Sequence, residues 1–449
     1  MNDRPNVLFI SIDDLRPELG CYGCDHIDSP HLDALALESM LYSRAFCQVP
    51  VCGASRASTQ TGARPRRERF IDYWARADEE MPEAAVLPEH LRRNGYHTVS
   101  RGKVLHTRAD SPQAWCEPAW RPAHEHPGYR DPDNVAVQLE NLRKAAANGQ
   151  RLPRGPAWEM IDGPESQCPD HQTADYVIQD LDRLAGGDQP FFLAAGFVRP
   201  HLPFSVPRRY FDRYDRDALP MPACPQPPSD VPDAALHRSP ELRLHYEGIE
   251  DQDPLSEPLT RSLRHGYFAA VSFLDEQIGR VLTAVDRLGL RDDTIVAFTV
   301  DHGWNLGEHA LWCKHCLYET SLRVPLMLRV PGRRPGRCDS IVDNLDIYPT
   351  FCELLDLPEP EHGLDGHSLV PTLEDPGASV RTHSQSRYHL GRSVRTDRYR
   401  YSRWEDASGF HGHTLFDHAE DPDEANNLAN DPTHAAVVAE HLHLLPGMD

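Results

Sequence analysis

The sequence lacks any long hydrophobic run. No apolar stretch in its 449 residues approaches the roughly 18 residues that a membrane span needs. Near the N-terminus, the apolar residues 7–12 are too few for the core of a signal peptide, and no small-residue cleavage site follows them. With 26% charged and 39% hydrophobic residues, the composition is that of a soluble globular protein. We therefore expect a cytoplasmic protein with no membrane partner.

Positive charge is also scarce. The chain has 46 lysine and arginine residues against 69 aspartate and glutamate residues, which gives a formal net charge of −23 with histidine neutral. Such a surface repels nucleic acids and long polyanions at long range. We therefore expect no nucleic-acid partner. An anionic substrate would have to be small, and a local cluster of cations and metal would have to attract it.

The eleven cysteines lack the regular pairing of a disulfide framework. Their number is odd and their spacing is irregular, which fits a reducing compartment. Two C-x-x-C pairs are present, Cys21 with Cys24 and Cys313 with Cys316. They leave a zinc site open as a less favoured alternative.

What the sequence does contain is an alternation of short apolar runs with helical patterns. Five apolar, β-branched or aromatic runs are typical of buried strands in a parallel sheet, and they cover residues 7–12, 98–100, 191–197, 295–300 and 326–330. Four segments have apolar residues at helical spacing, and they cover residues 31–39, 87–93, 173–184 and 267–288. This alternation predicts a layered α/β domain. After a change of composition near residues 371–378, residues 394–401 alternate like an antiparallel strand, and a closing helix follows.

Cys52 stands where a reactive group is expected. It follows the short apolar residues 49–51 and precedes small, helix-compatible residues, so we expect it at a turn that opens a helix. Free backbone N–H groups and the positive end of the helix dipole favour anions at such a turn. With Arg56 one turn further on the same face, a nucleophile at Cys52 would suit attack on an anionic ester. The alternative is an ordinary buried or helix-capping thiol.

Two of the predicted strands end in acidic residues. Asp13 and Asp14 follow residues 7–12, and Asp301 with His302 follows the strand at 295–300. In an open α/β sheet, ligands bind outside the carboxyl ends of the strands, so both pairs point to one site. Carboxylates so close together would repel unless a cation neutralised them, and oxygen ligands favour Ca²⁺ or Mg²⁺ over zinc. The alternative for such a pair is an N-cap of the next helix.

Cationic side chains follow other predicted strands. Lys103 and His106 come after the second strand and His201 comes after the third. Lys314 lies thirteen residues beyond Asp301, in a loop rich in aromatics and histidine. Taken singly, each is more commonly a solvated lysine or a satisfied histidine. Because four strand ends all deliver cations or metal ligands, we expect one shared site.

The segment Cys52-Gly53-Ala54-Ser55-Arg56, followed by Thr61-Gly62, resembles the signature of the sulfatase family, Cys-x-(Pro/Ala)-Ser-Arg and then Thr-Gly. The resemblance implies that a formylglycine-generating enzyme oxidises Cys52 to formylglycine, an aldehyde that hydrates to a gem-diol. One diol oxygen would attack sulfur, and the other would later expel sulfate. Ala54 stands where most members have proline, which departs from the recognition pattern of the converting enzyme, and Thr59 stands where leucine is usual.

The same resemblance implies a fold and a set of ligands. The fold would be an alkaline-phosphatase-like sandwich, with a large, mostly parallel sheet flanked by helices in residues 1–375. A small antiparallel sheet and a helix would form a C-terminal subdomain in residues 376–449. The metal would be calcium, with magnesium as the alternative. Its ligands would be Asp13, Asp14, Asp301, His302 and the modified Cys52.

Catalytic roles follow from the resemblance in the same way. Arg56, Lys103 and His106 would hold and activate the diol, and His201 and Lys314 would contact the sulfate and the leaving group. Cleavage of a sulfate ester builds negative charge on the sulfate oxygens, which fixed cations stabilise. The departing alkoxide needs a proton, for which a histidine is suited.

Longer motifs resemble the branch of the family that acts on the 2-O-sulfate of iduronate. They are Asp13-Asp14-Leu15-Arg16-Pro17, Gly102-Lys103-Val104 with His106, Arg199-Pro200-His201 and Asp301-His302-Gly303-Trp304. The substrate implied is a uronic acid 2-O-sulfate in a small glycosaminoglycan fragment, contacted by His201, Lys314 and Trp304. Trp304 would present its face at the mouth of the pocket, with a core position as the alternative.

Two other functions stay open at this point. One is a phosphonate monoester or phosphodiester hydrolase of the same superfamily, which would keep the fold and change the bond that is cleaved. The other is an inactive sugar-binding protein in which Cys52 remains a thiol.

Overall fold

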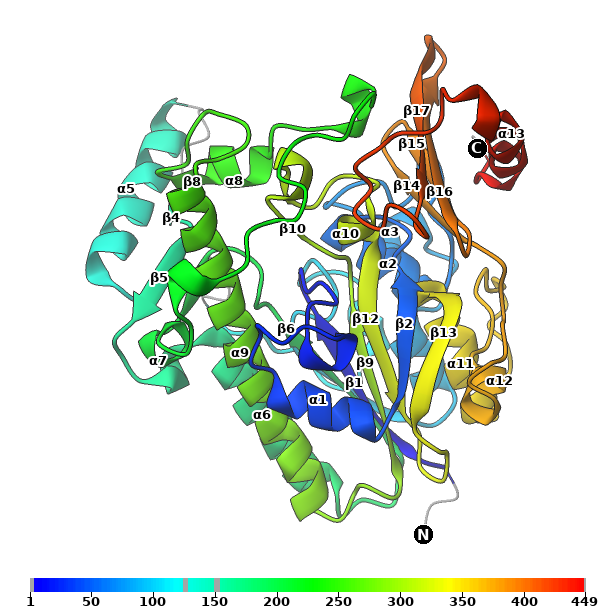
Figure 1. The fold of residues 1–449 in the computed structure, drawn as a ribbon. Coiled ribbons are helices and arrows are strands. Elements are labelled where there is room, and N and C mark those ends of the chain that lie inside the picture. Colours follow the sequence, from blue (N-terminus) through cyan, green and yellow to red (C-terminus); the bar gives the residue numbers. More distant parts are fainter. Residues whose placement is uncertain (1–3, 124–127, 149–153, 448–449) are drawn as a thin grey trace.

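A seven-stranded sheet forms the centre of the computed structural model, which describes residues 4–123, 128–148 and 154–447 (Figure 1). The strand order is β13-β2-β12-β9-β1-β6-β3. These strands are β1 (Asn6–Ile12), β2 (Met40–Phe46), β3 (His97–Gly102), β6 (Phe191–Phe197), β9 (Thr294–Val300), β12 (Arg323–Arg329) and β13 (Gly336–Asp343). Residues of all seven strands enter one hydrophobic core.

The five predicted strands are confirmed as β1, β3, β6, β9 and β12, with one change of direction. β1 pairs in parallel with β6 and β9, but β12 is antiparallel to both β9 and β2. The expectation of a parallel strand at residues 326–330 is therefore wrong. A parallel neighbour of β9 would need a long crossover, usually a helix. The connection instead holds the short hairpin of β10 (Asn305–Leu306) and β11 (Trp312–Cys313) and the one-turn helix α10 (Glu319–Leu322).

Strands β2 and β13 were not predicted from the sequence. Their apolar residues are interrupted by serine, arginine and aspartate, so neither segment shows a continuous apolar run. β2 is nevertheless mostly buried, because it lies between β12 and β13, whereas β13 lies at the edge of the sheet and is half buried.

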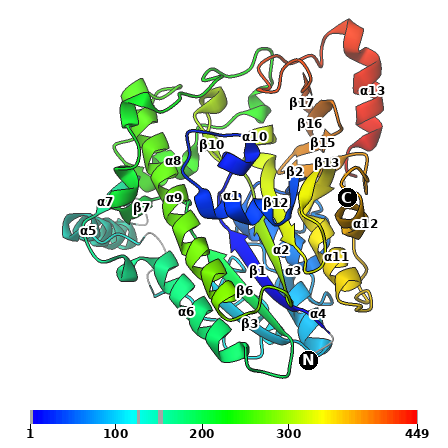
Figure 2. The same ribbon diagram turned by 60° about the horizontal axis from the view of Figure 1, so that its bottom comes forward.

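Helices cover both faces of the sheet (Figures 1 and 2). One face carries α1 (Pro30–Leu37), α6 (Pro169–Leu184) and α9 (Glu257–Arg287), and the other carries α2 (Cys52–Thr61), α4 (Leu87–Arg93) and α11 (Ile347–Leu354). The four predicted helices are confirmed as α1, α4, α6 and α9, although α9 begins well before residue 267. None of the helices in the described part of the chain could serve as a membrane span.

Further helices and strands extend this frame on more than one side (Figure 1). They are α3 (Ala77–Glu80), α5 (Pro132–Asn148), α7 (Arg208–Phe211), α8 (Pro240–His245), α12 (Val370–Glu374), β4 (Gly155–Pro156), β5 (Trp158–Ile161), β7 (Phe204–Pro207) and β8 (Tyr246–Glu247). β4 pairs with β8 and β5 with β7, so strand pairing ties residues 112–169 to residues 200–258, two stretches in which proline is frequent. This arrangement places α8 close to the central sheet's carboxyl edge.

A four-stranded antiparallel sheet forms the C-terminal part of the molecule. Its strands pair in the order β14 (Ser384–Tyr388), β15 (Gly391–Arg395), β16 (Tyr399–Asp406) and β17 (Gly409–Asp417), and α13 (Ala435–Leu444) lies beside them (Figure 1). A second apolar cluster around Val394, Tyr401 and Leu415 holds this part together. The chain therefore has the predicted α/β fold, with a mostly parallel central sheet between helices and a smaller antiparallel sheet. The boundary at residue 375 stays a prediction.

The prediction of a single strand over residues 394–401 is wrong. The backbone N–H of Thr396 donates to the carbonyl oxygen of Tyr399, and this turn divides the segment between β15 and β16. The reason lies in the polar residues Thr396, Asp397 and Arg398, since such residues favour turns. Apolar alternation on either side of the turn resembles one continuous strand when it is read from sequence.

Candidate active site

The ends of the central strands bring the predicted residues together at one edge of the sheet. Asp13 and Asp14 follow β1, Asp301 and His302 follow β9, and Lys103 follows β3. Because β1 and β9 are parallel neighbours, the backbone N–H of Asp14 donates to Oδ1 of Asp301 over 3.2 Å. The structure thus joins these strand ends into one site, as the sequence predicts.

Cys52 is the first residue of α2 and points into this group. Its Sγ lies 3.2 Å from Nε2 of His302, and its side chain is almost completely buried. Burial and the carboxylate of Asp13 raise the pKa of Cys52 to about 12. As a thiol, Cys52 would therefore stay protonated near neutral pH and would be a poor nucleophile. This position suits a residue that reacts only after conversion to another group.

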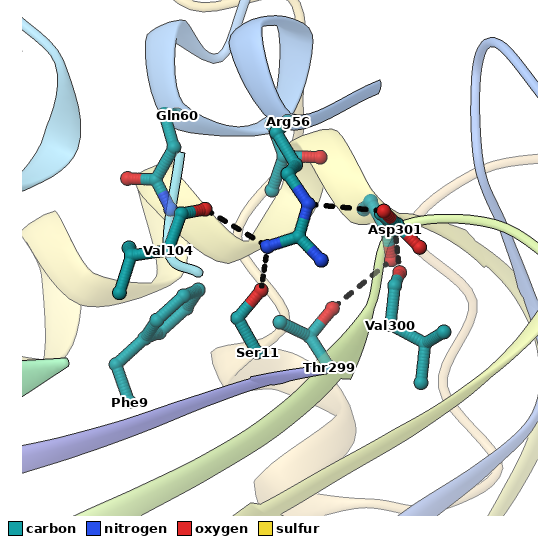
Figure 3. Close-up of a pocket in the computed structure, with 10 residues that line it drawn as sticks. Phe9, Ser11, Arg56, Gln60, Val104, Thr299, Val300 and Asp301 are labelled. Atoms are coloured by element: carbon teal, nitrogen blue, oxygen red, sulfur yellow. Dashed lines mark hydrogen bonds and ion pairs between the residues drawn. The ribbon is translucent and has the colours of Figure 1, made fainter. Parts of the chain in front are cut away.

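Arg56, one turn further along α2, binds the ends of several central strands through its guanidinium group. Its Nε donates to Oδ2 of Asp301 over 3.0 Å (Figure 3). One terminal nitrogen donates to Oγ of Ser11 (3.1 Å) and to the carbonyl of Val104 (3.0 Å), and the other donates to the carbonyl of Ile12 (3.1 Å). The buried guanidinium therefore binds the ends of β1, β3 and β9 to α2 and holds Asp301 in place.

Four of the predicted metal ligands are close enough to bind one ion. One atom from each lies within 4.8 Å of the others, and the four residues are Asp13, Cys52, Asp301 and His302. Asp14, the remaining predicted ligand, belongs to an overlapping group with Cys52 and His201. Oδ1 of Asp13 is buried and has no hydrogen-bond partner among the described residues, as expected of an oxygen that binds a cation.

The charges of the site also fit a divalent cation. Burial, together with repulsion from Asp13, raises the pKa values of Asp14 and Asp301. Burial acts in the same direction on Asp13, but Lys103 and Arg56 hold the pKa of this carboxyl well below its usual range. A bound cation would relieve the remaining repulsion, and an oxygen-rich ligand set suits Ca²⁺ or Mg²⁺. The residues present therefore fit the predicted metal.

The site contains two of the chain's three lysines, Lys103 and Lys314, whereas Lys144 is exposed on α5. Nζ of Lys103 pairs with Oδ2 of Asp13, and Nζ of Lys314 lies 3.0 Å from Oδ1 of Asp14. Burial lowers the pKa of each lysine, but the neighbouring carboxylates more than offset this and raise both pKa values. Both ammonium groups are therefore fixed positive charges in an otherwise acidic protein.

Glu241 on α8 is a residue of the site that the sequence did not reveal. Its Oε1 lies 3.0 Å from Nζ of Lys314 and 3.3 Å from Nε2 of His201. Burial would raise the pKa of Glu241, but Lys314 and His201 hold it well below the usual range. No motif or periodicity in the proline-rich sequence around this glutamate signals its position. The position of Glu241 becomes apparent only from the structure, in which α8 packs against the site.

His201 faces both acidic groups of this side of the site. Its Nδ1 lies 2.6 Å from the carbonyl oxygen of Leu202, and its Nε2 lies 3.7 Å from Oδ2 of Asp14. Burial and the ammonium group of Lys314 lower the pKa of His201 to about 4. The hydrogen bond to Leu202 fixes the ring, so that Nε2 is the nitrogen that faces Glu241 and Asp14.

His106 lies at the border of the site. It is half-buried, and its Nδ1 has no hydrogen-bond partner in the described part of the chain. Burial and the nearby Lys103 lower its pKa to about 2, so the ring is neutral. Its centroid lies 6.3 Å from that of Tyr73. The structure therefore places His106 between the buried cations and the protein surface.

Trp304 does not line an open mouth, contrary to the expectation from the sequence. Its side chain is 1% exposed, and its ring centroid lies 5.0 Å from Nζ of Lys314 and 6.3 Å from the centroid of His201. The backbone N–H of Trp304 donates to the carbonyl of Thr320 over 2.7 Å, which draws the residue inward just after His302. The indole therefore supports Lys314 through a cation–π contact.

The zinc alternative gains no support from the described residues. The three groups of metal-ligand side chains found there centre on Asp13, on Asp14 and on Glu319 with His418 and Glu424, and no group contains two cysteines. Sγ of Cys316 lies instead 3.1 Å from Oγ of a serine, and all eleven cysteines are free.

Two family profiles match the sequence. The profile of the sulfatase family matches residues 5–357, which is more than half of the chain. A profile of the C-terminal part of N-sulphoglucosamine sulphohydrolase matches residues 307–446. Because the two matches overlap, they do not fix a boundary between the main and C-terminal parts.

Individual proteins are similar over nearly the whole chain. Iduronate 2-sulfatase of Mus musculus is 30% identical over 525 aligned residues, which cover 97% of this chain and 93% of the relative. Iduronate 2-sulfatase of Homo sapiens is 34% identical over 397 residues, which cover 83% and 68%. Among solved structures, phosphonate monoester hydrolase of Agrobacterium radiobacter has a TM-score of 0.79 at 25% identity, covering 98% of this chain and 94% of that chain.

Proposed function

This chain belongs to the sulfatase family, and we propose that it hydrolyses the 2-O-sulfate of a uronic acid in small glycosaminoglycan fragments. The observation that carries the proposal is the convergence of Cys52 with Asp13, Asp301 and His302 beside two buried lysines. The position of the sulfate and the kind of sugar are proposed from the similarity to mouse and human iduronate 2-sulfatases.

The ligands and the nucleophile have separate tasks in this proposal. Asp13, Asp14, Asp301 and His302 would hold a calcium or magnesium ion, which supplies positive charge for the sulfate oxygens. Cys52, once converted to formylglycine and hydrated, supplies the hydroxyl that attacks sulfur.

The cationic residues position and neutralise the substrate. Lys103 and Lys314 are fixed charges that stabilise the sulfate as negative charge builds on its oxygens. The ring of His201 is held by Leu202, so its Nε2 is the nitrogen that would serve the departing sugar oxygen. Because the pKa of His201 is lowered to about 4, Nε2 can pass on a proton only after the negative charge of the bound sulfate has offset that of Lys314 and the ring has taken up a proton. In the net reaction, water is consumed, the ester S–O bond breaks, and the sugar alcohol and sulfate leave.

Conversion of Cys52 requires a maturation partner that acts early. All ten residues of α2, from Cys52 to Thr61, are buried. A formylglycine-generating enzyme could not reach this segment in the folded protein, so it would have to act before the chain folds. Ala54 stands at the usual proline position. Conversion of Cys52 would therefore require that the enzyme accept alanine at this position of its recognition segment.

Regioselectivity tests the proposal. We expect the purified enzyme with Ca²⁺ to desulfate 2-O-sulfated uronic acid disaccharides faster than 6-O-sulfated disaccharides or aryl sulfates, as measured by sulfate release. A Cys52→Ala variant serves as the control for contaminating sulfatases. Preference for a 6-O-sulfated sugar or an aryl sulfate would refute the positional assignment.

Hydrolysis of phosphonate monoesters or phosphodiesters is the second candidate. It is favoured by the similarity in fold to the Agrobacterium radiobacter phosphonate monoester hydrolase. The same preparation should be assayed with an aryl phosphonate monoester and an aryl phosphodiester. Higher kcat/KM on either than on the sulfated disaccharides would select this candidate instead.

A further inference from the structure

Two neighbouring aromatic residues near the site are open to solvent. Trp74 is 65% exposed and Tyr73 is 37% exposed, and their ring centroids lie 4.5 Å apart. Single apolar residues scattered over a surface are ordinary, but two adjacent large rings form a patch. We call Tyr73 and Trp74 the aromatic pair.

The aromatic pair is continuous with the catalytic residues. The ring of Tyr73 lies 6.3 Å from that of His106, so three rings lead from the half-buried histidine to the exposed indole. The backbone of the pair also packs against α2. A Cβ atom on Gly53, next to Cys52, would lie 2.3 Å from the carbonyl oxygen of Tyr73. Glycine at position 53 therefore permits the pair to lie this close to the nucleophile.

The loop that carries the pair is held in place by hydrogen bonds. The backbone N–H of Ala54 donates to the carbonyl of Asp72 over 3.0 Å. Oδ1 of Asp72 accepts from the backbone N–H of Trp74 over 2.7 Å, and Ala75 is buried directly behind it. Rigid aromatic side chains offer contact area at low entropic cost. The loop thus presents the indole outward from a fixed base.

We propose that the aromatic pair is a stacking subsite for the sugar ring next to the sulfated sugar. This inference rests on the proposed function, because it takes the substrate to be an oligosaccharide. A flat aromatic face suits the apolar face of a sugar ring, and the polar edges of Tyr73 and Trp74 tolerate water at the rim. The rings run from His106 at the border of the site to the exposed Trp74, and the proposal places the second sugar along this line.

The subsite predicts that affinity rises with substrate length. For wild-type enzyme, KM should fall from a 2-O-sulfated monosaccharide to a disaccharide and a tetrasaccharide. In Trp74→Ala, KM for the two longer substrates should rise by about tenfold, the effect of one lost aromatic contact. The kcat for each substrate, and the KM for the monosaccharide, should stay within about twofold of wild type. Trp74→Phe should restore most of the affinity.

A matched control is available on the C-terminal sheet. Phe410 on β17 is 53% exposed. It belongs to the C-terminal sheet, whereas Cys52 lies on α2 beside the central sheet. Phe410→Ala should leave KM unchanged for all substrate lengths. Equal loss for every length in Trp74→Ala would indicate damage to the site rather than loss of a subsite, and would overturn the proposal. Unchanged KM for the longer substrates in Trp74→Ala would also overturn it.

Two further outcomes distinguish a sugar subsite from a failed substrate assignment and from a contact between copies of the chain. If wild-type enzyme is inactive on every 2-O-sulfated sugar, the proposed function fails, and calorimetric binding of the tetrasaccharide to wild type and Trp74→Ala then decides the subsite alone. Equal affinities would overturn it, and weaker binding to the variant would support it.

If light scattering shows a dimer that Trp74→Ala converts to a monomer, the pair is a contact between copies, and the subsite is refuted.

Discussion

Among the described residues, two clusters of carboxylates with histidine stand out, a buried one at the edge of the central sheet and a partly buried one beside the C-terminal sheet. The first contains Asp13, Asp301 and His302, and the second contains Glu319 and Glu424 with a histidine. Both bring ligand atoms within 4.8 Å of one another, so ligand proximity alone does not separate them. What separates the two clusters is how far positively charged side chains neutralise their carboxylates.

In the C-terminal cluster, arginines compensate the carboxylates. Arg395 Nε lies 3.1 Å from Oε2 of Glu319, and Arg400 pairs with both Glu319 and Glu424, the latter over 2.9 Å. Burial would raise the pKa values of the two glutamates, but Arg395, His418 and Arg400 lower that of Glu319, and His418 and Arg400 lower that of Glu424. A cluster whose carboxylates are already neutralised has no need of a metal. It joins α10 to the C-terminal sheet.

In the central cluster the balance is different. Asp14 and Asp301 have raised pKa values although two lysines and Arg56 are close by. Oδ1 of Asp13 also has no hydrogen-bond partner among the described residues. The comparison teaches that buried carboxylates whose pKa stays raised despite nearby cations mark a site suited to a further cation, whereas carboxylates whose pKa is lowered mark a structural junction.

The largest expected effect comes from removing a charge in the central cluster. Asp301→Asn should lower kcat/KM on a sulfated sugar by on the order of 10³-fold, because it removes a metal ligand and the partner of Arg56. Addition of Ca²⁺ should raise the Tm of the chelated wild-type protein, and this rise should be absent in the variant. If Asp301→Asn kept full activity and its Tm still rose with Ca²⁺, the central cluster would not be a metal site of the kind proposed, and the two clusters would not differ in this respect.

The second effect is on stability and concerns the C-terminal cluster. Glu424→Gln should lower the free energy of unfolding by about 3 kcal/mol near neutral pH, because it leaves Arg400 partly uncompensated in a buried position. Urea unfolding measures this loss, while kcat of the folded enzyme and its Tm response to Ca²⁺ should be unchanged. A variant that loses its Ca²⁺ response would show that this cluster is also a metal site.

This loss should depend on pH in a defined direction. Because the pKa of Glu424 is lowered in the folded protein, its contribution is present above the unfolded pKa of about 4.3 and is lost as pH falls through the folded value. The difference in unfolding free energy between wild type and Glu424→Gln should therefore be constant near neutrality and shrink below about pH 4. A difference that grew on acidification would contradict the assigned ion pairs.

The smallest expected effect comes from Glu241, which belongs to the central site but not to the metal ligands. Glu241→Gln should lower kcat about tenfold, since Lys314 keeps Asp14 as a partner while His201 loses the nearer of its two neighbouring carboxylates. Steady-state kinetics on a sulfated disaccharide measures this. Glu247→Gln, at an exposed position on β8, is the matched control. Unchanged kcat in Glu241→Gln would show that Lys314 and His201 hold their positions without it.

The residues of the site that follow strands could be predicted from the pattern of apolar runs. The loop residue Lys314 was expected from the resemblance, whereas Glu241 and Trp74 were not predicted. Asp13, Lys103 and Asp301 directly follow apolar runs, and parallel strands bring such positions to one edge. Glu241 lies on a short helix and Trp74 on a turn, and the positions of both depend on long-range packing such as the contact between Gly53 and Tyr73.

The errors have the same origin. The residues around Trp304 in the sequence do not reveal that its backbone N–H donates to the carbonyl of Thr320. This hydrogen bond turns the indole ring inward, where it contacts Lys314. Likewise, the antiparallel direction of β12 depends on how the chain returns from β9, which apolar periodicity does not encode. Local pattern fixes the elements, and their connections decide which side chains meet.

The state of Cys52 is the most direct test of the proposed chemistry. Mass spectrometry of the proteolytic peptide that contains Cys52, from protein produced together with a formylglycine-generating enzyme, should show the side chain as an aldehyde, with CHO in place of CH₂SH. The same peptide found entirely as the thiol, in protein that nevertheless cleaves sulfated sugars, would contradict the assignment of Cys52 as the source of the nucleophile.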